Sequence, residues 1–93
     1  MNKYQLLYII DNGIADEAKQ EIVDKFSALI ESLGGAVETI DKWGAKKLAY
    51  EIDGKTEGYY VLVKFSANAD VPAEIDRQMK ISDDVVRQMI TRI

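Results

Sequence analysis

Three lysines and the only tryptophan of the chain stand close together, at Lys42, Trp43, Lys46 and Lys47. Lysine ammonium groups bind phosphates as point charges, and an indole ring can stack on a base or a sugar. Lysines on an edge strand also serve a purely structural purpose, because they block unwanted strand pairing. The cluster therefore indicates either phosphate contact or a protected edge, and Trp43 is either a contact residue or a packed one.

Further cations fall near the two ends of the chain, at Lys3, Arg87 and Arg92. An arginine guanidinium can bind a phosphate through two parallel hydrogen bonds, which gives it more geometric specificity than lysine has. We include these three residues with the cluster as candidate phosphate contacts.

Side chains that usually carry catalysis or hold metals are scarce. The sequence has no cysteine and no histidine, so it lacks a thiol nucleophile, a thiolate metal ligand and the commonest general base. Asp16-Glu17 falls at a predicted helix start and Asp83-Asp84 in a predicted turn. Acids at such positions interact favourably with the helix dipole or cap the helix. We therefore predict a non-enzyme with no cofactor and no metal site.

The charge of the chain is unevenly distributed. Its net charge is −4 over 93 residues, yet residues 42–49 hold three lysines and no acid, while residues 11–31 hold six acids and two lysines. A local field steers a partner more than the total charge does. No apolar run approaches the ~20 residues of a membrane span, and no signal peptide is apparent, so we expect a cytoplasmic protein.

Hydrophobic periodicity predicts six elements within a single domain over residues 1–93. Alternation predicts strands over residues 3–10, 37–52, 59–67 and 85–93, and helical spacing predicts helices over residues 15–33 and 70–80. This order, βαββαβ, is the α+β, ferredoxin-like split βαβ arrangement. It predicts a four-stranded antiparallel sheet with two helices on one face, with the first and third strands in the centre.

Local signals mark where these elements end. Gly34-Gly35 stops the first helix, and Asp53-Gly54 is typical of a hairpin turn. Asp70 is predicted to cap the second helix, with Pro72 in its first turn.

Apolar positions divide the strands between two faces. Val37 and Leu48 have opposite parity on one strand, so burying both requires a bulge, which we place at Gly44. The predicted core face carries Leu6, Tyr8, Leu48, Val61, Val63 and Phe65. The opposite, open face is then predicted to carry Leu7, Ile9, Tyr60, Leu62, Val85 and Met89. An open face that meets only water is mostly polar, so this one predicts a protein or an RNA as a partner, or else a second copy of the chain or a C-terminal segment that covers it.

Stacked bases fit this face less well than an apolar protein surface. The RNA-recognition motif places aromatic residues on its third strand. Residues 57–64 instead have Glu57 where that pattern requires a lysine or arginine, and Val61 and Lys64 where it requires aromatic residues. The first strand offers Leu7 and Ile9 in place of aromatic residues.

Three runs of residues resemble the bacterial small-subunit ribosomal protein S6 family. They are Trp-Gly-Ala-Lys-Lys-Leu-Ala-Tyr at 43–50, Glu-Gly-Tyr-Tyr at 57–60 and Ile-Ser-Asp-Asp-Val-Val-Arg-Gln-Met at 81–89. The resemblance extends over residues 4–92. It implies a ferredoxin-like fold, and binding to small-subunit ribosomal RNA in the central domain (platform) as a heterodimer with ribosomal protein S18.

The resemblance also implies site residues. The paired basic residues of the family correspond to Lys46 and Lys47, and its last-strand arginine corresponds to Arg87. With the other candidates, the predicted RNA-binding residues are Lys3, Lys42, Trp43, Lys46, Lys47, Arg87 and Arg92, and the predicted partner-protein face is Leu7, Ile9, Tyr60, Leu62, Val85 and Met89. Lysine at 46 and 47, where many members have arginine, removes bidentate phosphate contacts.

We therefore predict a structural ribosomal RNA-binding protein of the bacterial small subunit, with no membrane and no DNA as partners. The sequence leaves one alternative open, a homodimeric ferredoxin-like regulatory or ligand-binding module that uses the same open face.

Overall fold

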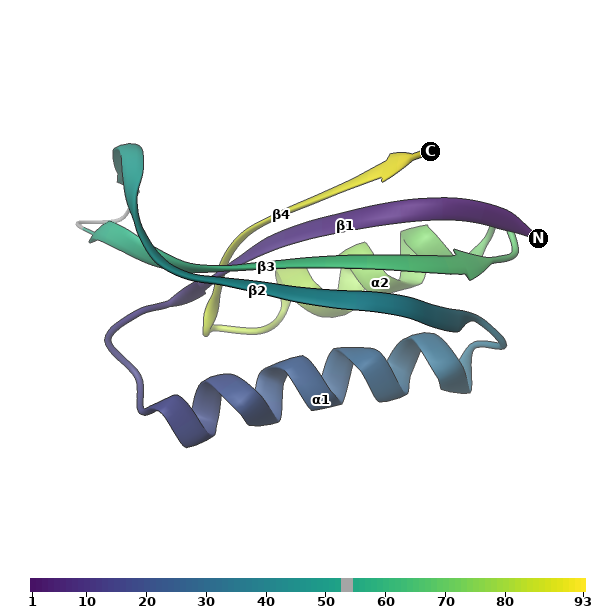
Figure 1. Cartoon of the computed structure of the whole chain (residues 1–93), viewed down its shortest axis with the longest axis horizontal. Coiled ribbons are helices and arrows are strands. Elements are labelled where there is room, and N and C mark those ends of the chain that lie inside the picture. The colour runs from purple at the N-terminus through teal and green to yellow at the C-terminus, as the bar shows by residue number, and fades with distance from the viewer. Residues whose placement is uncertain (53–54) are drawn as a thin grey trace.

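The six predicted elements are present and in the predicted order. The computed structural model describes the backbone of residues 1–52 and 55–93 and the side chains of residues 1–48 and 57–93. The elements are β1 (Asn2–Asp11), α1 (Asp16–Ser32), β2 (Ala36–Ile52), β3 (Lys55–Ala67), α2 (Val71–Lys80) and β4 (Val85–Arg92). The antiparallel strands form one sheet in the order β2-β3-β1-β4, and both helices cover the same side of it (Figure 1). The prediction of a ferredoxin-like fold is confirmed.

The helix ends follow the predicted signals with one exception. Gly34 has a φ of 87° and donates its backbone N–H to Glu31, so it closes α1 as predicted. Pro72 lies in the first turn of α2. The predicted cap at Asp70 is wrong, because its side chain makes no capping hydrogen bond. A backbone turn starts this helix instead, with the N–H of Val71 donating to the carbonyl of Asn68 at 3.1 Å. The predicted Asp53-Gly54 turn lies outside the described residues.

The core lies between the sheet and the helices. Its strand residues alternate with period two, and its helix residues follow one stripe on each helix, as amphipathic elements require. The fully buried side chains include Leu6, Tyr8, Ile10, Val61, Val63 and Phe65 from the sheet, and Phe26, Ile30, Ile75 and Met79 from the helices. Burying each large apolar side chain contributes about 1.5–3 kcal/mol to folding.

Strand β2 changes register with β3 twice before Leu48. One shift lies between Lys42 and Gly44, where Gly44 has a φ of 84°, which confirms the predicted bulge. The other lies between Val37 and Thr39 and was not predicted. Two shifts restore the original parity, so Leu48 turns to the open face.

The placement of Leu48 on the core face is therefore wrong. Leu48 is buried, but its Cδ2 lies 3.3 Å from the point that a β carbon on Gly58 would occupy, and that point also lies against Ile9 on the open face. Leu48 packs at the open-face end of the β2–β3 hairpin, outside the cluster beneath the helices.

The predicted open-face position of Val85 is also wrong. The pairing of β1 with β4 shifts between Ile9 and Ile10, which brings Val85 opposite Ile10. Val85 consequently packs against the core cluster on the helix side.

The hydroxyl of Tyr8 is the basis of a stability prediction. Tyr8 is fully buried, and its Oη has no hydrogen-bond partner among the described residues. Burial, with smaller contributions from Tyr59 and Asp24, raises the pKa of Tyr8 above its ordinary value. A buried polar group without a partner costs about 1–3 kcal/mol. We expect Tyr8→Phe to raise the free energy of unfolding by about 1 kcal/mol, measured by urea denaturation.

The same substitution should change the response to alkali. Because the pKa of Tyr8 is raised in the folded state, the folded protein keeps the neutral phenol while the unfolded chain ionises near pH 10. The free energy of unfolding is therefore unaffected by this ionisation below about pH 10 and falls as the pH rises above it. Tyr8→Phe should reduce that fall. Tyr4→Phe is the control, because the Tyr4 hydroxyl accepts a hydrogen bond from Asn2 at 3.3 Å and should give no gain. A less stable Tyr8→Phe protein would contradict the prediction.

Candidate functional site

The side of the sheet that faces away from the helices, here called the open face, has an apolar centre. Leu7 on β1 lies opposite Leu62 on one side and Met89 on the other, and Ile9 lies opposite Tyr60. Ile9 is 8% exposed, whereas Met89 is 51% exposed. The apolar centre (Leu7, Ile9, Tyr60, Leu62, Met89) therefore joins three strands, and it contains every predicted partner-face residue except Val85.

Four cations with described side chains surround the apolar centre on the same face. Lys46 lies opposite Gly58, Lys64 opposite Gln5 and Arg87 opposite Ile9, and Lys3 forms an ion pair of 3.6 Å with Glu38. Among the residues whose side chains are described, the acids of this face are Asp11, Glu38 and Asp41. Lys64 was not among the predicted residues, although its even position, shared with Tyr60 and Leu62 on the same strand, was a signal that could have found it.

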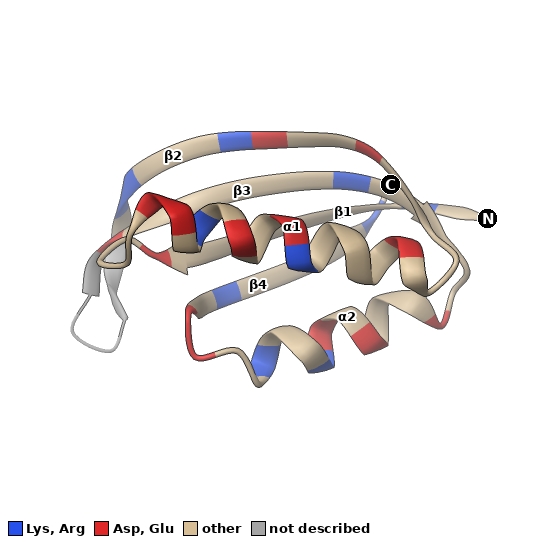
Figure 2. Ribbon diagram, turned by 90° about the horizontal axis from the view of Figure 1, so that it is seen from below, with Lys and Arg blue, Asp and Glu red and all other residues tan. Residues whose placement is uncertain are grey.

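The acidic surface lies on the opposite side of the molecule. The acids of α1 are all exposed, and Figure 2 shows them along the helix layer. They are Asp16, Glu17, Glu21, Asp24 and Glu31. The net charge of the chain therefore describes neither face, because most of the negative charge lies on the helix side and the cations just described lie on the open face.

The structure does not bring all seven predicted RNA-binding residues together. Lys42 lies opposite Val61 on the helix side, where its ammonium donates to Gln20 of α1. Lys47 lies opposite Glu57, and Arg92 lies opposite Tyr4 and donates to Asn2 at 2.9 Å. The open face retains Lys3, Trp43, Lys46 and Arg87, because strand alternation sends neighbouring residues to opposite sides.

Trp43 is a surface residue at the β2 bulge. Its side chain is 41% exposed, and its Nε1 donates to Asp41 Oδ2 at 3.1 Å. The indole lies nearly parallel to the ring of Tyr60, with 6.3 Å between centroids and 9° between planes. The ammonium of Lys46 lies 5.0 Å from the centre of the indole. The structure thus decides against a core position for Trp43.

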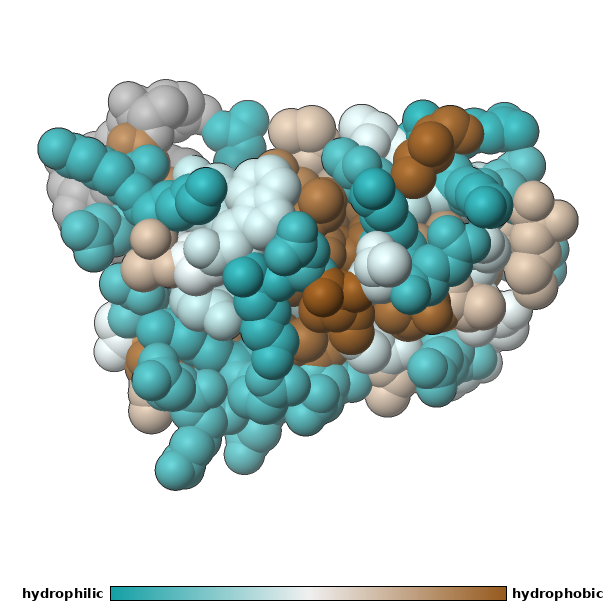
Figure 3. Space-filling view, viewed as in Figure 1, coloured by the Kyte–Doolittle hydropathy of each residue, from teal (hydrophilic) through white to brown (hydrophobic). Residues whose placement is uncertain are grey.

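A small cavity opens beside the apolar centre, between β1 and β4. Its volume is about 150 Å³, and its lining includes Leu7, Ile9 and Met89 with Arg87. Apolar surface also appears elsewhere, since Ile40 of β2 is 41% exposed on the helix side. Figure 3 shows hydrophobic residues gathered over the middle of β2 and β3, with hydrophilic residues around them.

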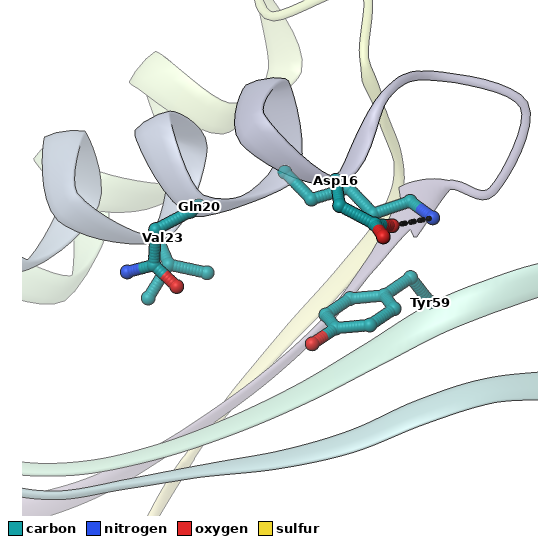
Figure 4. Close-up of a pocket in the computed structure, with 5 residues that line it drawn as sticks. Asp16, Gln20, Val23 and Tyr59 are labelled. Carbon is teal, nitrogen blue, oxygen red and sulfur yellow. Dashed lines mark hydrogen bonds and ion pairs between the residues drawn. The ribbon is translucent and has the colours of Figure 1, made fainter.

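A larger cavity of about 320 Å³ lies between α1 and β3 (Figure 4). Lys19 in its wall is only 8% exposed, and its ammonium donates to Asn12 at 3.1 Å and to Asp16 at 3.4 Å. It also lies 5.1 Å from the centre of the Tyr59 ring. These contacts fasten the first turn of α1 to the loop before it and to the sheet, so Lys19 has a structural role.

Two carboxyl groups of α2, away from the open face, have lowered pKa values. Hydrogen bonds from Arg77 and then Gln78 lower the pKa of Glu74 to about 2. Hydrogen bonds from Lys80 and then Gln88 lower the pKa of Asp76, and the second of these bonds fastens β4 to α2. Among the residues that the structure describes, no group of acids could hold a metal ion. No described helix is long and apolar enough to cross a membrane.

Fold and face together define the class of protein: a ferredoxin-like α+β domain whose sheet leaves one partly apolar, cation-bordered face uncovered. The family model for ribosomal protein S6 matches residues 3–92. The chain belongs to the ribosomal protein S6 family, whose members are structural proteins and not enzymes.

Relatives support this assignment along the whole chain. The small ribosomal subunit protein bS6 of Alkaliphilus oremlandii is 50% identical over 93 residues, and that of Alkaliphilus metalliredigens is 52% identical over 93 residues. Each match covers 100% of this chain and 98% of the relative. The crystal structure of 30S ribosomal protein S6 from Thermotoga maritima superimposes with a TM-score of 0.95 at 22% identity, covering 99% of this chain and 87% of the other. That structure supports the fold.

Proposed function

We propose that this chain is a structural component of the bacterial small ribosomal subunit, and that it binds ribosomal RNA of the central domain (platform) as a heterodimer with ribosomal protein S18. The open face carries the proposal, because it combines an apolar centre with surrounding cations. The family assignment supports it, since the matching relatives are named as small ribosomal subunit proteins. The protein then works on the ribosome in the cytoplasm.

The two kinds of surface take different partners. The aliphatic side chains of the apolar centre are suited to a protein, since they offer no hydrogen bonds with which to read an RNA. Lys46 and Arg87 at its border are suited to phosphates. Lys42, Lys47 and Arg92 point to the other side of the sheet, so they contact the same RNA only if it passes around a sheet edge.

The experiment that tests the proposal compares the free protein with the heterodimer. A chain of net charge −4 should bind RNA weakly alone, and tightly once the partner contributes to the interface. A gel-shift titration with central-domain ribosomal RNA measures both affinities. Free protein that binds as tightly as the heterodimer would contradict this order, and a heterodimer that fails to bind would contradict the function.

Charge removal on the open face should weaken RNA binding. We expect Lys46→Gln or Arg87→Gln to lower the RNA affinity of the heterodimer by about 3- to 10-fold, and to reduce the slope of log affinity against log salt by about 1, because each removes one phosphate contact. Lys25→Gln on α1 is the matched control and should change neither quantity. Equal losses in all three variants would show that only total charge matters.

Self-association through the open face is the alternative outcome. Light scattering on the purified chain distinguishes the two, because a stable dimer would occupy the face that the partner protein needs. We expect a monomer that forms a one-to-one complex with ribosomal protein S18.

A further inference from the structure

Exposed Trp43 and half-buried Tyr60 of the open face form a single unit, although the sequence places them in different predicted sites. Trp43 was predicted as an RNA contact and Tyr60 as part of the partner-protein face. In the structure their rings are nearly parallel and adjacent, and the ammonium of Lys46 lies over the indole. This grouping separates an aromatic, cationic end of the open face from its aliphatic middle.

We propose that Trp43, Tyr60 and Lys46 form one binding site for an unpaired nucleotide, with the base against the rings and its phosphate on the lysine. The proposal depends on the RNA-binding function proposed above, and it adds which chemical part of the RNA this end of the face takes. It also assigns Tyr60 to the RNA and not to the partner protein.

The backbone of β2 explains why an indole is presented here. Trp43 lies within the register shift between Lys42 and Gly44, so it lies outside the regular pairing with β3. Gly44 completes the shift with its positive φ, and no neighbour lies within 4 Å of the point where a β carbon would be. Apart from the two chain neighbours, nothing crowds the bulge at Gly44, and bulges commonly direct a side chain toward a functional site.

The rings are held in position before any ligand arrives. The hydrogen bond from Trp43 Nε1 to Asp41 orients the indole, and Tyr60 is half-buried on a central strand opposite Ile9. A fixed aromatic surface binds with a smaller loss of conformational entropy than a mobile one. A tryptophan is largely buried in most folded proteins, so a fixed indole with 41% exposure has apolar area available for stacking.

The position of Lys46 over the indole favours a nucleotide over an apolar protein surface at this end of the face. An exposed cation–π contact such as that of Lys46 is weak, so the ammonium can exchange the indole for a phosphate and uncover the ring. The carboxylate of Asp41 lies at the nitrogen edge of the indole and repels a phosphate there, which directs the phosphate to the Lys46 side. Bases in a duplex are stacked already, so the site takes a single-stranded nucleotide.

Trp43 is the only tryptophan of the chain, so its fluorescence reports directly on this site. We expect a short single-stranded RNA, titrated to the high concentrations that weak binding by the free protein requires, to quench that fluorescence, and a duplex of the same sequence at equal concentration to leave it unchanged. Equal quenching by both forms, or by neither, would overturn the proposal.

Variants test each part of the site in the heterodimer, with labelled single-stranded RNA followed by anisotropy. We expect Trp43→Leu and Tyr60→Leu each to weaken binding by about 5- to 100-fold, and Trp43→Phe to weaken it less because a ring remains. Lys25→Gln is the control, since it removes an exposed cation of α1 on the far side of the sheet and should change affinity less than threefold. Thermal unfolding of each variant confirms that the fold is kept.

Failure of this proposal is distinguishable from failure of the proposed function. If the wild-type heterodimer does not bind ribosomal RNA in the gel shift, the proposed function fails. If it binds and the two leucine variants bind equally well, only the nucleotide site fails. If Trp43 fluorescence responds to the partner protein and not to single-stranded RNA, the rings belong to the protein interface and the proposal is wrong.

Discussion

Replacing Leu7 with glutamate is expected to weaken docking of the proposed partner protein, ribosomal protein S18, while the domain stays folded. Leu7 occupies the middle of the apolar centre, between Leu62 on β3 and Met89 on β4, and it is half-buried. A carboxylate there would have to lose its water when a protein covers the face, with no cation directly opposite it. Substitutions of hot-spot residues, which cluster near the centre of an interface, cost about 2 kcal/mol or more, so the affinity for ribosomal protein S18 should fall by at least about 30-fold. Calorimetric titration measures the loss.

The control for this substitution is Ile40→Glu. Ile40 is an apolar residue of β2 with 41% exposure, but it lies opposite Val63 and so on the helix side. The same change of chemistry there should leave partner affinity unchanged. Met89→Glu is a second open-face variant on an exposed edge strand, where the cost to folding is small. Partner binding that survives in both open-face variants would show that the partner docks elsewhere.

Replacing Gly58 with alanine is expected to lower the free energy of unfolding by about 2 kcal/mol. The new β carbon would lie 2.2 Å from Cγ2 of Ile9 and 3.3 Å from Cδ2 of Leu48, and the first distance is shorter than any real contact. Ile9 is buried and branched at its own β carbon, so it cannot rotate away freely. Overpacking of this kind typically costs about 1–3 kcal/mol. Urea denaturation measures the change.

A double-mutant cycle tests the cause. Ile9→Ala removes the methyl group that the new β carbon would meet, so the double variant should be less destabilised than the sum of the two single variants. Gly13→Ala is the control, because its nearest neighbour is the Asp11 carboxylate oxygen at 3.3 Å and the site is exposed. Strict additivity in the cycle would show that Gly58 is needed for a reason other than this contact.

The elements and the order of the sheet were predictable because their signals are local or follow from general rules. Alternation in Leu6, Tyr8 and Ile10 marks a strand, and a right-handed crossover leaves few ways to arrange four strands and two helices. The bulge at Gly44 was predicted from a parity conflict between Val37 and Leu48 that the structure does not contain, because Leu48 lies on the open face. The valid part of the signal was the glycine, which tolerates the required φ. The family resemblance was carried by residues 43–50, 57–60 and 81–89, which form contiguous runs.

The side of the sheet on which each cation lies was only partly predictable. Adjacent residues on a strand must point to opposite sides, so Lys46 and Lys47 were separable from the sequence. The side that each one takes was not, because it depends on the register of β2 against β3.

The sequence by itself determined the elements, the fold, the family and the uneven charge, since all four depend on the order of residue types along the chain. Only the tertiary structure decided that Leu48 lies on the open face, that Val85 lies beneath the helices and that Trp43 pairs with Tyr60. The physical reason is that periodicity fixes which residues share a face within one strand, whereas the pairing of one strand with another fixes which face that is. A single register shift that no local signal marks, such as the one at Val37, reverses the facing of the residues that follow it until another shift restores it.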